Sequence, residues 1–207
     1  MTRIKICGIT NLVDALKAVE LGADAVGFVF ADSPRRIGPD RVRTISTALP
    51  PFVSRVGVFV DEKFPVIKEM VKYCRLDIVQ LYESTGLLHD TEFIVPVIRA
   101  FRVENRDILD AIEESKLSCF LMDTHDPDLP GGTGRCFDWD IAGKAAKLGK
   151  VILSGGLNPA NIVDALEAVR PYAVDVSSGV EKNPGIKDPV RMKLFVDEVK
   201  NWDSRTN

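Results

Sequence analysis

One pattern constrains the fold of this chain more than any other feature. An apolar segment of strand length, a polar loop and a helical segment follow one another eight times along the sequence. The predicted strands span residues 3–7, 25–30, 53–60, 78–82, 93–101, 118–122, 151–153 and 173–176. The predicted helices span residues 11–22, 39–48, 65–73, 86–89, 104–115, 139–148, 158–169 and 189–199. Apolar strands that alternate with helices indicate a parallel sheet covered by helices.

The number of units points to a closed sheet. Eight is the number of strands at which a parallel sheet of this kind closes into a barrel. We therefore predict an α/β fold, a single (β/α)8 TIM barrel domain over residues 1–207. The alternative is an open doubly wound sheet. The pattern disfavours it because neither end of the chain leaves a strand or helix outside the repeat.

Composition excludes several classes of protein. The chain has 207 residues, 45% of them hydrophobic, and a net charge of -3 with acidic and basic residues interleaved, which argues against a nucleic-acid or membrane surface. No apolar run approaches the roughly 18 residues of a membrane helix, and no signal region precedes the first strand, so a cytoplasmic location is expected. The cysteines and histidines are too widely spaced to predict a disulfide framework or a metal site.

The first predicted strand has an unusual polar face. Arg3, Lys5 and Cys7 alternate with Ile4 and Ile6, so the charged residues and the thiol share one side of the strand. We expect Arg3 and Lys5 to point into the barrel, with Cys7 above them at its mouth. A nearby ammonium favours a thiolate, and Lys5 is therefore predicted to favour the ionised form of Cys7.

In a barrel, functional groups lie at the carboxyl ends of the strands. The polar side chains at these positions are Cys7, Arg35, Arg36, Gln80, Tyr82, Asp123 and Asp175. A lone cysteine is commonly a small core residue, and an aspartate after a strand is commonly a turn residue. Asp175 is harder to explain in this way, because strand alternation directs it into the mouth, where an unpaired carboxylate is costly. Asp123 precedes a long glycine-rich loop that we predict to be a mobile cover.

Two glycine-rich turns follow the last two predicted strands. Their small residues are Gly155, Gly156, Ser177, Ser178 and Gly179. Small residues let backbone amides approach an anion closely, and these two turns are adjacent in a barrel, where phosphate is commonly bound. The sequence therefore predicts a phosphorylated small-molecule substrate.

Ten short motifs, in one order and register, resemble the phosphoribosylanthranilate isomerase family of tryptophan biosynthesis. The resemblance runs from Arg3 to about Lys187. The motifs are KICGIT (5–10), GADAVGFVF (22–30), SPR (33–35), VGVFV (56–60), VQL (79–81), LMDT (121–124), GGTG (131–134), FDW (137–139), LSGGL (153–157) and DVSSGVE (175–181).

The resemblance implies an Amadori rearrangement of N-(5-phosphoribosyl)anthranilate that needs no metal or organic cofactor. It implies that Cys7 is the general base and that Asp123 is the general acid. It also implies that Arg35 binds the anthranilate carboxylate and that Asp175 lies near the sugar. The implied partner is a small phosphosugar, with no nucleic acid or membrane, and the chain is expected to be a monomer or a homodimer.

This chain departs from the family in the wall of the pocket beside Gln80. The family commonly has histidine and glycine where Tyr82 and Glu83 stand here, and an aromatic ring where Arg36 stands. Two other functions are possible for such a barrel. One is the histidine-pathway aldose–ketose isomerase, which usually acts through two aspartates, and Cys7 argues against it. The other is a barrel that binds phosphosugars without catalysis. The presence of both Cys7 and Asp123 argues against it.

Overall fold

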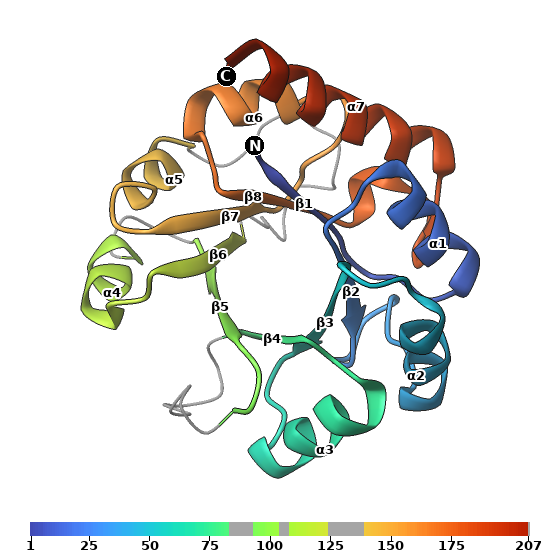
Figure 1. Ribbon diagram of the computed structural model, residues 1–207. Coiled ribbons are helices and arrows are strands. Elements are labelled where there is room, and N and C mark those ends of the chain that lie inside the picture. Colours follow the sequence, from blue (N-terminus) through green and yellow to red (C-terminus); the bar gives the residue numbers. More distant parts are fainter. Residues whose placement is uncertain (83–92, 104–107, 124–138, 207) are drawn as a thin grey trace.

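The computed structural model describes residues 1–82, 93–103, 108–123 and 139–206. Eight parallel strands form a closed barrel in which each strand pairs with its neighbour along the chain and β8 returns to β1 (Figure 1). The strands are β1 (Arg3–Ile6), β2 (Ala25–Val29), β3 (Ser54–Phe59), β4 (Ile78–Tyr82), β5 (Val97–Arg102), β6 (Cys119–Asp123), β7 (Lys150–Ser154) and β8 (Ala173–Val176). The closed barrel confirms the predicted fold class and excludes the open sheet.

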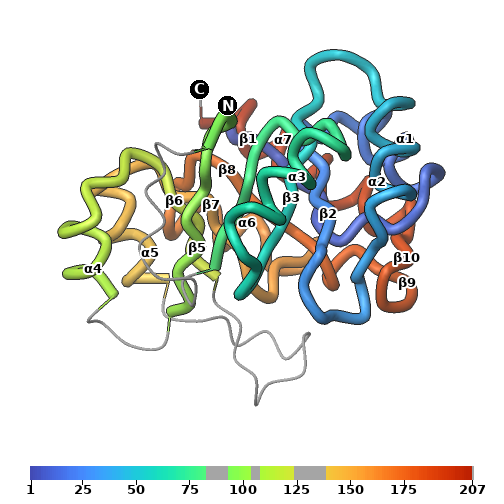
Figure 2. Tube along the Cα trace, turned by 90° about the horizontal axis from the view of Figure 1, so that it is seen from below, coloured from blue at the N-terminus to red at the C-terminus, as the bar shows by residue number. Residues whose placement is uncertain are grey.

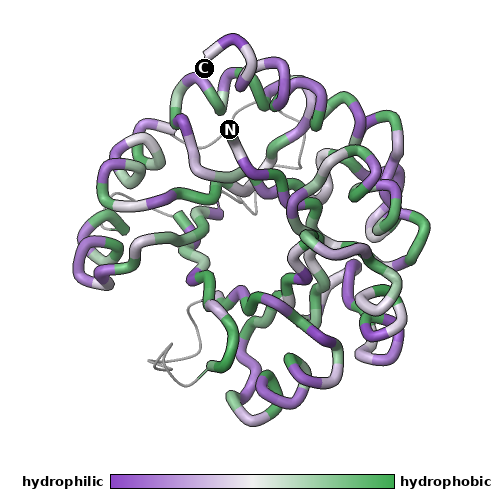
Figure 3. Tube along the Cα trace, viewed as in Figure 1, coloured by the Kyte–Doolittle hydropathy of each residue, from purple (hydrophilic) through white to green (hydrophobic). Residues whose placement is uncertain are grey.

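Helices surround the barrel on its outer face (Figure 1). They are α1 (Leu12–Leu21), α2 (Pro39–Ala48), α3 (Phe64–Cys74), α4 (Ile108–Ser115), α5 (Trp139–Ala145), α6 (Ile162–Val169) and α7 (Pro189–Thr206). Apolar and polar residues are interspersed along these helices (Figure 3). This is expected where one side of each helix packs on strands and the other faces water. Within the described part of the chain, no helix combines the length and apolar character needed to span a membrane.

The ends of α1 match the sequence signals closely. The Asn11 side chain caps the helix by accepting a hydrogen bond from the Asp14 backbone N–H, and Gly22 ends it with φ +105°. Only glycine adopts that left-handed conformation without strain. Two predicted features, the helix over residues 86–89 and the cover loop after Asp123, lie outside the described residues.

In the part of the chain that the structure describes, two predicted elements begin four residues later than the sequence pattern suggests. The strand predicted from residue 93 begins at Val97, directly after Pro96, because proline lacks the N–H that a central strand donates. The helix predicted from residue 158 begins at Ile162. Before it, the Asn161 side chain accepts a hydrogen bond from the Asn158 N–H, which favours a turn over a further helical turn.

A short hairpin that the repeat pattern does not predict follows β8. A 3-10 turn, η2 (Ser178–Val180), leads into β9 (Glu181–Asn183), which pairs antiparallel with β10 (Ile186–Lys187). The Lys187 backbone N–H donates to the Asp14 carboxylate, so the hairpin is joined to the start of α1. This places Glu181 and Lys187 beside the carboxyl ends of β1 and β8.

The chain ends meet at the opposite end of the barrel (Figures 1 and 2). The Thr2 backbone N–H and hydroxyl donate to the two oxygens of Asp203 at 2.7 and 2.9 Å. Asp203 is only 4% exposed. The last helix is therefore tied to the residue that precedes β1.

Candidate active site

Most of the predicted site residues line one cavity at the carboxyl ends of the strands. This mouth cavity has a volume of ≈ 630 Å³. Its walls include Cys7, Arg35, Gln80, Tyr82, Arg102, Asp123, Ser154, Gly155, Gly156, Leu157, Asp175, Ser177 and Ser178. Because the strands are parallel and all end at this edge, the barrel brings together side chains that lie far apart in the sequence.

Cys7 follows β1 directly and occupies space left by a glycine on the neighbouring strand. A Cβ atom on Gly27 of β2 would lie 2.7 Å from the Cys7 Sγ and 3.1 Å from the Lys5 Cε. Any larger residue at Gly27 would displace the thiol. Burial raises the pKa of the Cys7 thiol, and the Lys5 ammonium opposes that increase.

Lys5 lies inside the barrel between two polar partners. Its ammonium donates to Asp175 Oδ2 at 2.8 Å and to Gln80 Oε1 at 2.9 Å. Burial disfavours the charged ammonium, yet the Asp175 carboxylate leaves the pKa of Lys5 above its ordinary value. Lys5 and Asp175 occupy paired positions on β1 and β8, so the ion pair bridges the seam where the barrel closes.

The expectation for Arg3 was wrong. Its side chain is 61% exposed and forms an ion pair with Asp24 at 2.6 Å, instead of pointing into the barrel core. The alternation of side chains along a strand gives the face but not the depth. Arg3 stands at the first position of β1, where the barrel interior opens to solvent at the end away from the mouth.

Asp175 presents one carboxylate oxygen to Lys5 and has a second oxygen available. Oδ1 is buried and has no hydrogen-bond partner among the described residues. Burial raises the pKa of the Asp175 carboxyl, an effect that Lys5 opposes. A buried acceptor without a partner is costly unless a ligand supplies a donor, so this oxygen is suited to a ligand hydroxyl.

Asp123, the last residue of β6, is held by a tyrosine from β4. The Tyr82 hydroxyl donates to Asp123 Oδ2 at 2.7 Å, and the Arg102 guanidinium lies 5.4 Å from the centre of the Tyr82 ring. Burial and the neighbouring carboxylate raise the pKa of Tyr82. The phenol therefore stays neutral and acts as a donor at physiological pH.

The two glycine-rich turns pack directly against each other. Gly155 and Gly156 both have positive φ, +89° and +63°, and a Cβ on Gly179 would lie 1.9 Å from the carbonyl oxygen of Leu157. Gly179 does not itself line the mouth cavity, unlike the other predicted turn residues. Its contribution is to let the turns after β7 and β8 approach closely.

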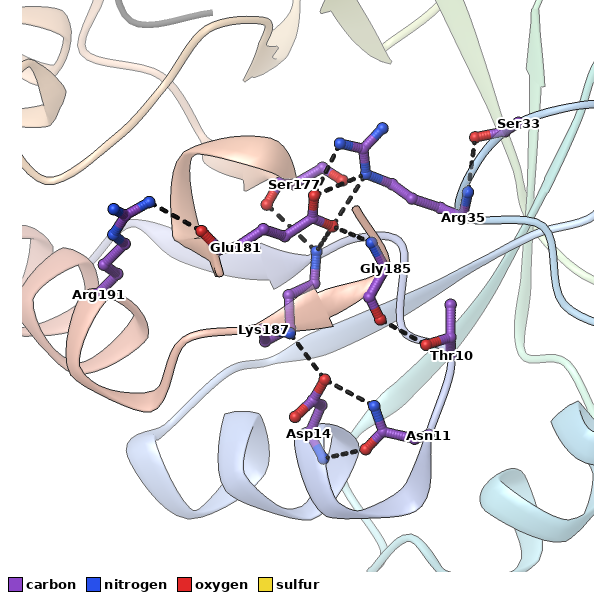
Figure 4. Close-up of polar contacts among 10 residues, drawn as sticks. All are labelled: Thr10, Asn11, Asp14, Ser33, Arg35, Ser177, Glu181, Gly185, Lys187 and Arg191. Carbon is purple, nitrogen blue, oxygen red and sulfur yellow. Dashed lines mark hydrogen bonds and ion pairs between the residues drawn. The ribbon is translucent and has the colours of Figure 1, made fainter. Parts of the chain in front are cut away.

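Arg35 reaches the mouth from the loop after β2 and is already engaged with a carboxylate. Its guanidinium forms a forked ion pair with Glu181, with Nη2 and Oε2 2.7 Å apart (Figure 4). Sequence reasoning gave no role to Glu181, although it ends one of the quoted motifs. Arg36 is exposed and does not line the cavity.

Comparisons with known proteins show the family of this chain. A family model described as N-(5'phosphoribosyl)anthranilate (PRA) isomerase matches residues 4–198. The chain belongs to the phosphoribosylanthranilate isomerase family. An isomerase of this family from Geobacter metallireducens is 48% identical over 201 residues, which cover 97% of this chain and 100% of that protein.

Solved structures of the family have the same fold. The isomerase from Thermotoga maritima has a TM-score of 0.89 and 47% identity, covering 97% of this chain and 100% of that one. A family structure in complex with reduced 1-(o-carboxyphenylamino)-1-deoxyribulose 5-phosphate has a TM-score of 0.86 and 45% identity, with the same coverage. Another solved structure is of monomers generated from the dimeric Thermotoga maritima isomerase, so that relative has been obtained in both a dimeric and a monomeric form.

Proposed function

We propose that the mouth cavity converts N-(5'-phosphoribosyl)anthranilate into 1-(2-carboxyphenylamino)-1-deoxyribulose 5-phosphate, the isomerisation step of tryptophan biosynthesis. One observation carries the proposal: a thiol at the end of β1 and a carboxyl group at the end of β6 line the same cavity. General acid–base isomerisation needs an acid and a base that reach the substrate from different sides. In this proposal Cys7 is the base and Asp123 is the acid.

The reaction then proceeds through two proton transfers. Asp123 delivers a proton to the furanose ring oxygen, and the ring opens to an iminium ion, which acidifies the proton on carbon 2 of the sugar. The Cys7 thiolate removes that proton, and tautomerisation of the resulting enolamine gives the ketone. The Tyr82 hydroxyl, which donates to Asp123 Oδ2, stabilises the carboxylate that remains after the first transfer.

The remaining residues bind the substrate in this scheme. The backbone amides of the turns at Gly155, Gly156, Ser177 and Ser178 hold the phosphate, and the buried Asp175 Oδ1, which has no described partner, accepts a sugar hydroxyl. Arg35, which lines the same cavity, binds the anthranilate carboxylate. Gln80, held by Lys5, forms part of the cavity wall.

Substitution of the two proposed catalytic groups tests the scheme. We expect Cys7→Ser and Asp123→Asn each to lower kcat by at least about a hundredfold, the scale of one general acid or base. The affinity for the reduced product analogue should change little, because both variants retain the shape of the cavity. The substrate is generated in situ and its conversion is followed by the loss of anthranilate-type fluorescence.

Cys74→Ser is the matched control. Cys74 is also buried, but it lies on α3 and its thiol contacts the Pro39 carbonyl oxygen, away from the mouth cavity. Near-normal turnover in Cys7→Ser or Asp123→Asn would remove that residue from its proposed role. A wild-type protein that binds the analogue without turning over the substrate would contradict the proposed activity and favour a binding-only barrel.

A further inference from the structure

Three charged side chains form a compact cluster beside the mouth cavity (Figure 4). Arg35 comes from the loop after β2, Glu181 begins β9 and Lys187 ends β10. Arg35 Nε lies 2.9 Å from Glu181 Oε1 and 3.1 Å from Oε2, while Nη2 lies 2.7 Å from Oε2. The Lys187 ammonium lies 2.7 Å from Oε1. One carboxylate is therefore shared by two cations.

The charges in this cluster do not cancel. The side chains of Lys187 and Glu181 are 0% and 5% exposed, whereas that of Arg35 is 23% exposed. Among the described residues, neither cation forms an ion pair with any carboxylate other than Glu181. The cluster thus carries one net positive charge, and Arg35 is the member that lines the mouth cavity.

Lys187 is buried and donates to two oxygen acceptors. Besides Glu181, its Nζ donates to the Ser177 carbonyl oxygen at 3.2 Å. Burial leaves the pKa of Lys187 below its ordinary value, although the hydrogen bond and charge of Glu181 oppose that effect. Burial also opposes the ionised form of Glu181, but its bonds with Arg35 and Lys187 leave the pKa of its carboxyl below the ordinary value.

Arg35 is fixed from two sides. Glu181 engages Nε and Nη2, and the methylene stem of Arg35 lies over Gly8, where a Cβ would be 2.6 Å from the Arg35 Cδ. Nη1 has no hydrogen-bond partner among the described residues. A guanidinium offers five N–H donors in a planar fork, so the edge that carries Nη1 is available to a second carboxylate.

We propose that Lys187 is a positioning residue that sets the preference of the site for a substrate carboxylate, acting through Glu181 on Arg35. An isolated pair of Arg35 and Glu181 would be neutral, and an incoming carboxylate would meet the repulsion of Glu181 along with the attraction of Arg35. Lys187 offsets the charge of Glu181 from its buried side. Arg35 then keeps both its orientation, which Glu181 provides, and its attraction for an aromatic carboxylate. The inference rests on the proposed role of Arg35.

Two ligands that differ only in the carboxylate test this. One is the reduced product analogue, and the other is the same compound with a phenylamino group in place of the 2-carboxyphenylamino group. Calorimetric titration gives the ratio of their dissociation constants for each variant. We expect Lys187→Met to reduce the preference for the carboxylate ligand about tenfold, the scale of one close charge interaction. Binding of the ligand without the carboxylate should change much less.

Lys182→Met is the matched control. Lys182 is exposed and lies on the same hairpin, and its substitution removes the same formal charge. The ratio of the two dissociation constants in Lys182→Met should therefore equal that of the wild type. Lys187→Gln provides a second variant that keeps a hydrogen-bond donor for Glu181, and it should show the same loss of preference. Because a ratio of two ligands is compared within one folded variant, a general loss of stability does not change it.

The outcomes separate the two proposals. A wild-type ratio retained in both Lys187 variants overturns the inference and leaves Arg35 as the carboxylate ligand. An equal loss in Lys182→Met also overturns it, because the effect would then come from the overall charge of the hairpin. A wild-type protein with no preference for the carboxylate ligand contradicts the role of Arg35 itself.

Discussion

At the scale of the residue, the environment of Cys7 combines two opposing effects. Burial raises the pKa of its thiol, while the Lys5 ammonium directly below favours the thiolate. Burial prevails, so the resting group is more difficult to ionise than a free thiol. A base of this kind is strong once ionised, and its ionised fraction depends on every nearby charge.

Removal of Lys5 should therefore raise the pKa of the Cys7 thiol further. In Lys5→Met the influence that opposes burial is lost, so the pKa of the Cys7 thiol should rise and alkylation should require a higher pH. The rate of modification at Cys7, followed by mass spectrometry across a pH series, measures this. Cys119, which lies on β6 and whose raised pKa has no contribution from Lys5, is an internal control. An unchanged profile at Cys7 would leave Lys5 with a structural role only.

Residue types at strand ends were predictable from sequence, but their partners were not. The repeat placed Cys7, Asp123 and Asp175 at one edge, because parallel strands end together. The pairing of Lys5 with Asp175 joins positions 170 residues apart, and that of Arg35 with Glu181 joins positions 146 apart. A single sequence carries no local signal for such pairs. The presence of Glu181 and Lys187 just after the turn that follows β8 was the available clue.

At the scale of the element, the turns after β7 and β8 depend on the absence of one side chain. Gly179→Ala would place a Cβ 1.9 Å from the Leu157 carbonyl oxygen and 2.8 Å from the Asn158 Cβ, and backbone cannot rotate away as a flexible side chain can. We expect a loss of about 1–3 kcal/mol in the free energy of unfolding, as for overpacked sites. We also expect weaker binding of the phosphorylated product analogue, because the turns must move apart.

Gly38→Ala is the control for this substitution. A Cβ on Gly38 meets no atom within 4 Å, and its backbone, with φ -76° and ψ 150°, is accessible to alanine. Its cost should stay below about 1 kcal/mol, the scale of a change at a helix N-cap. Urea unfolding and calorimetric titration give both quantities. Equal stability and affinity in Gly179→Ala and the wild type would show that the turns tolerate separation.

Element boundaries were less predictable than element types. Apolar periodicity identified strands and helices, but Pro96 and the Asn158–Asn161 turn moved the starts of β5 and α6 through local hydrogen bonding. The β9–β10 hairpin escaped prediction because its residues follow neither a strand nor a helix period. Its position is set instead by contacts with the start of α1, such as that between Lys187 and Asp14.

At the scale of the whole molecule, side-chain contacts at both ends of the barrel join the last part of the chain to the first, in addition to the backbone pairing of β8 with β1. Near the mouth, Lys5 and Asp175 bridge the seam. At the other end, Asp203 of α7 accepts two hydrogen bonds from Thr2. The two contacts share no residue, so changes at the distant end should affect stability without altering the chemistry of the mouth.

Asp203→Ala should destabilise the fold and spare the activity. Removal of the carboxylate leaves the buried Thr2 N–H and hydroxyl without acceptors, which costs about 1–3 kcal/mol for each unsatisfied group. We expect a lower Tm with kcat and KM unchanged at a temperature where the variant is folded. Asp197→Ala is the control, because Asp197 lies on the same helix and forms an exposed ion pair with Lys193. A large change in kcat for Asp203→Ala would contradict this separation of the two ends.

The contact between Thr2 and Asp203 also indicates that the chain can be circularly permuted. Since the two termini lie together on the side away from the mouth, a short linker could join them without crossing the substrate's path. A circularly permuted chain, opened in a surface loop such as that at Phe52, which is fully exposed, would retain every strand pairing and every residue of the mouth. Folding of such a chain would show that the barrel depends on the pairing of its strands and not on their order along the polypeptide.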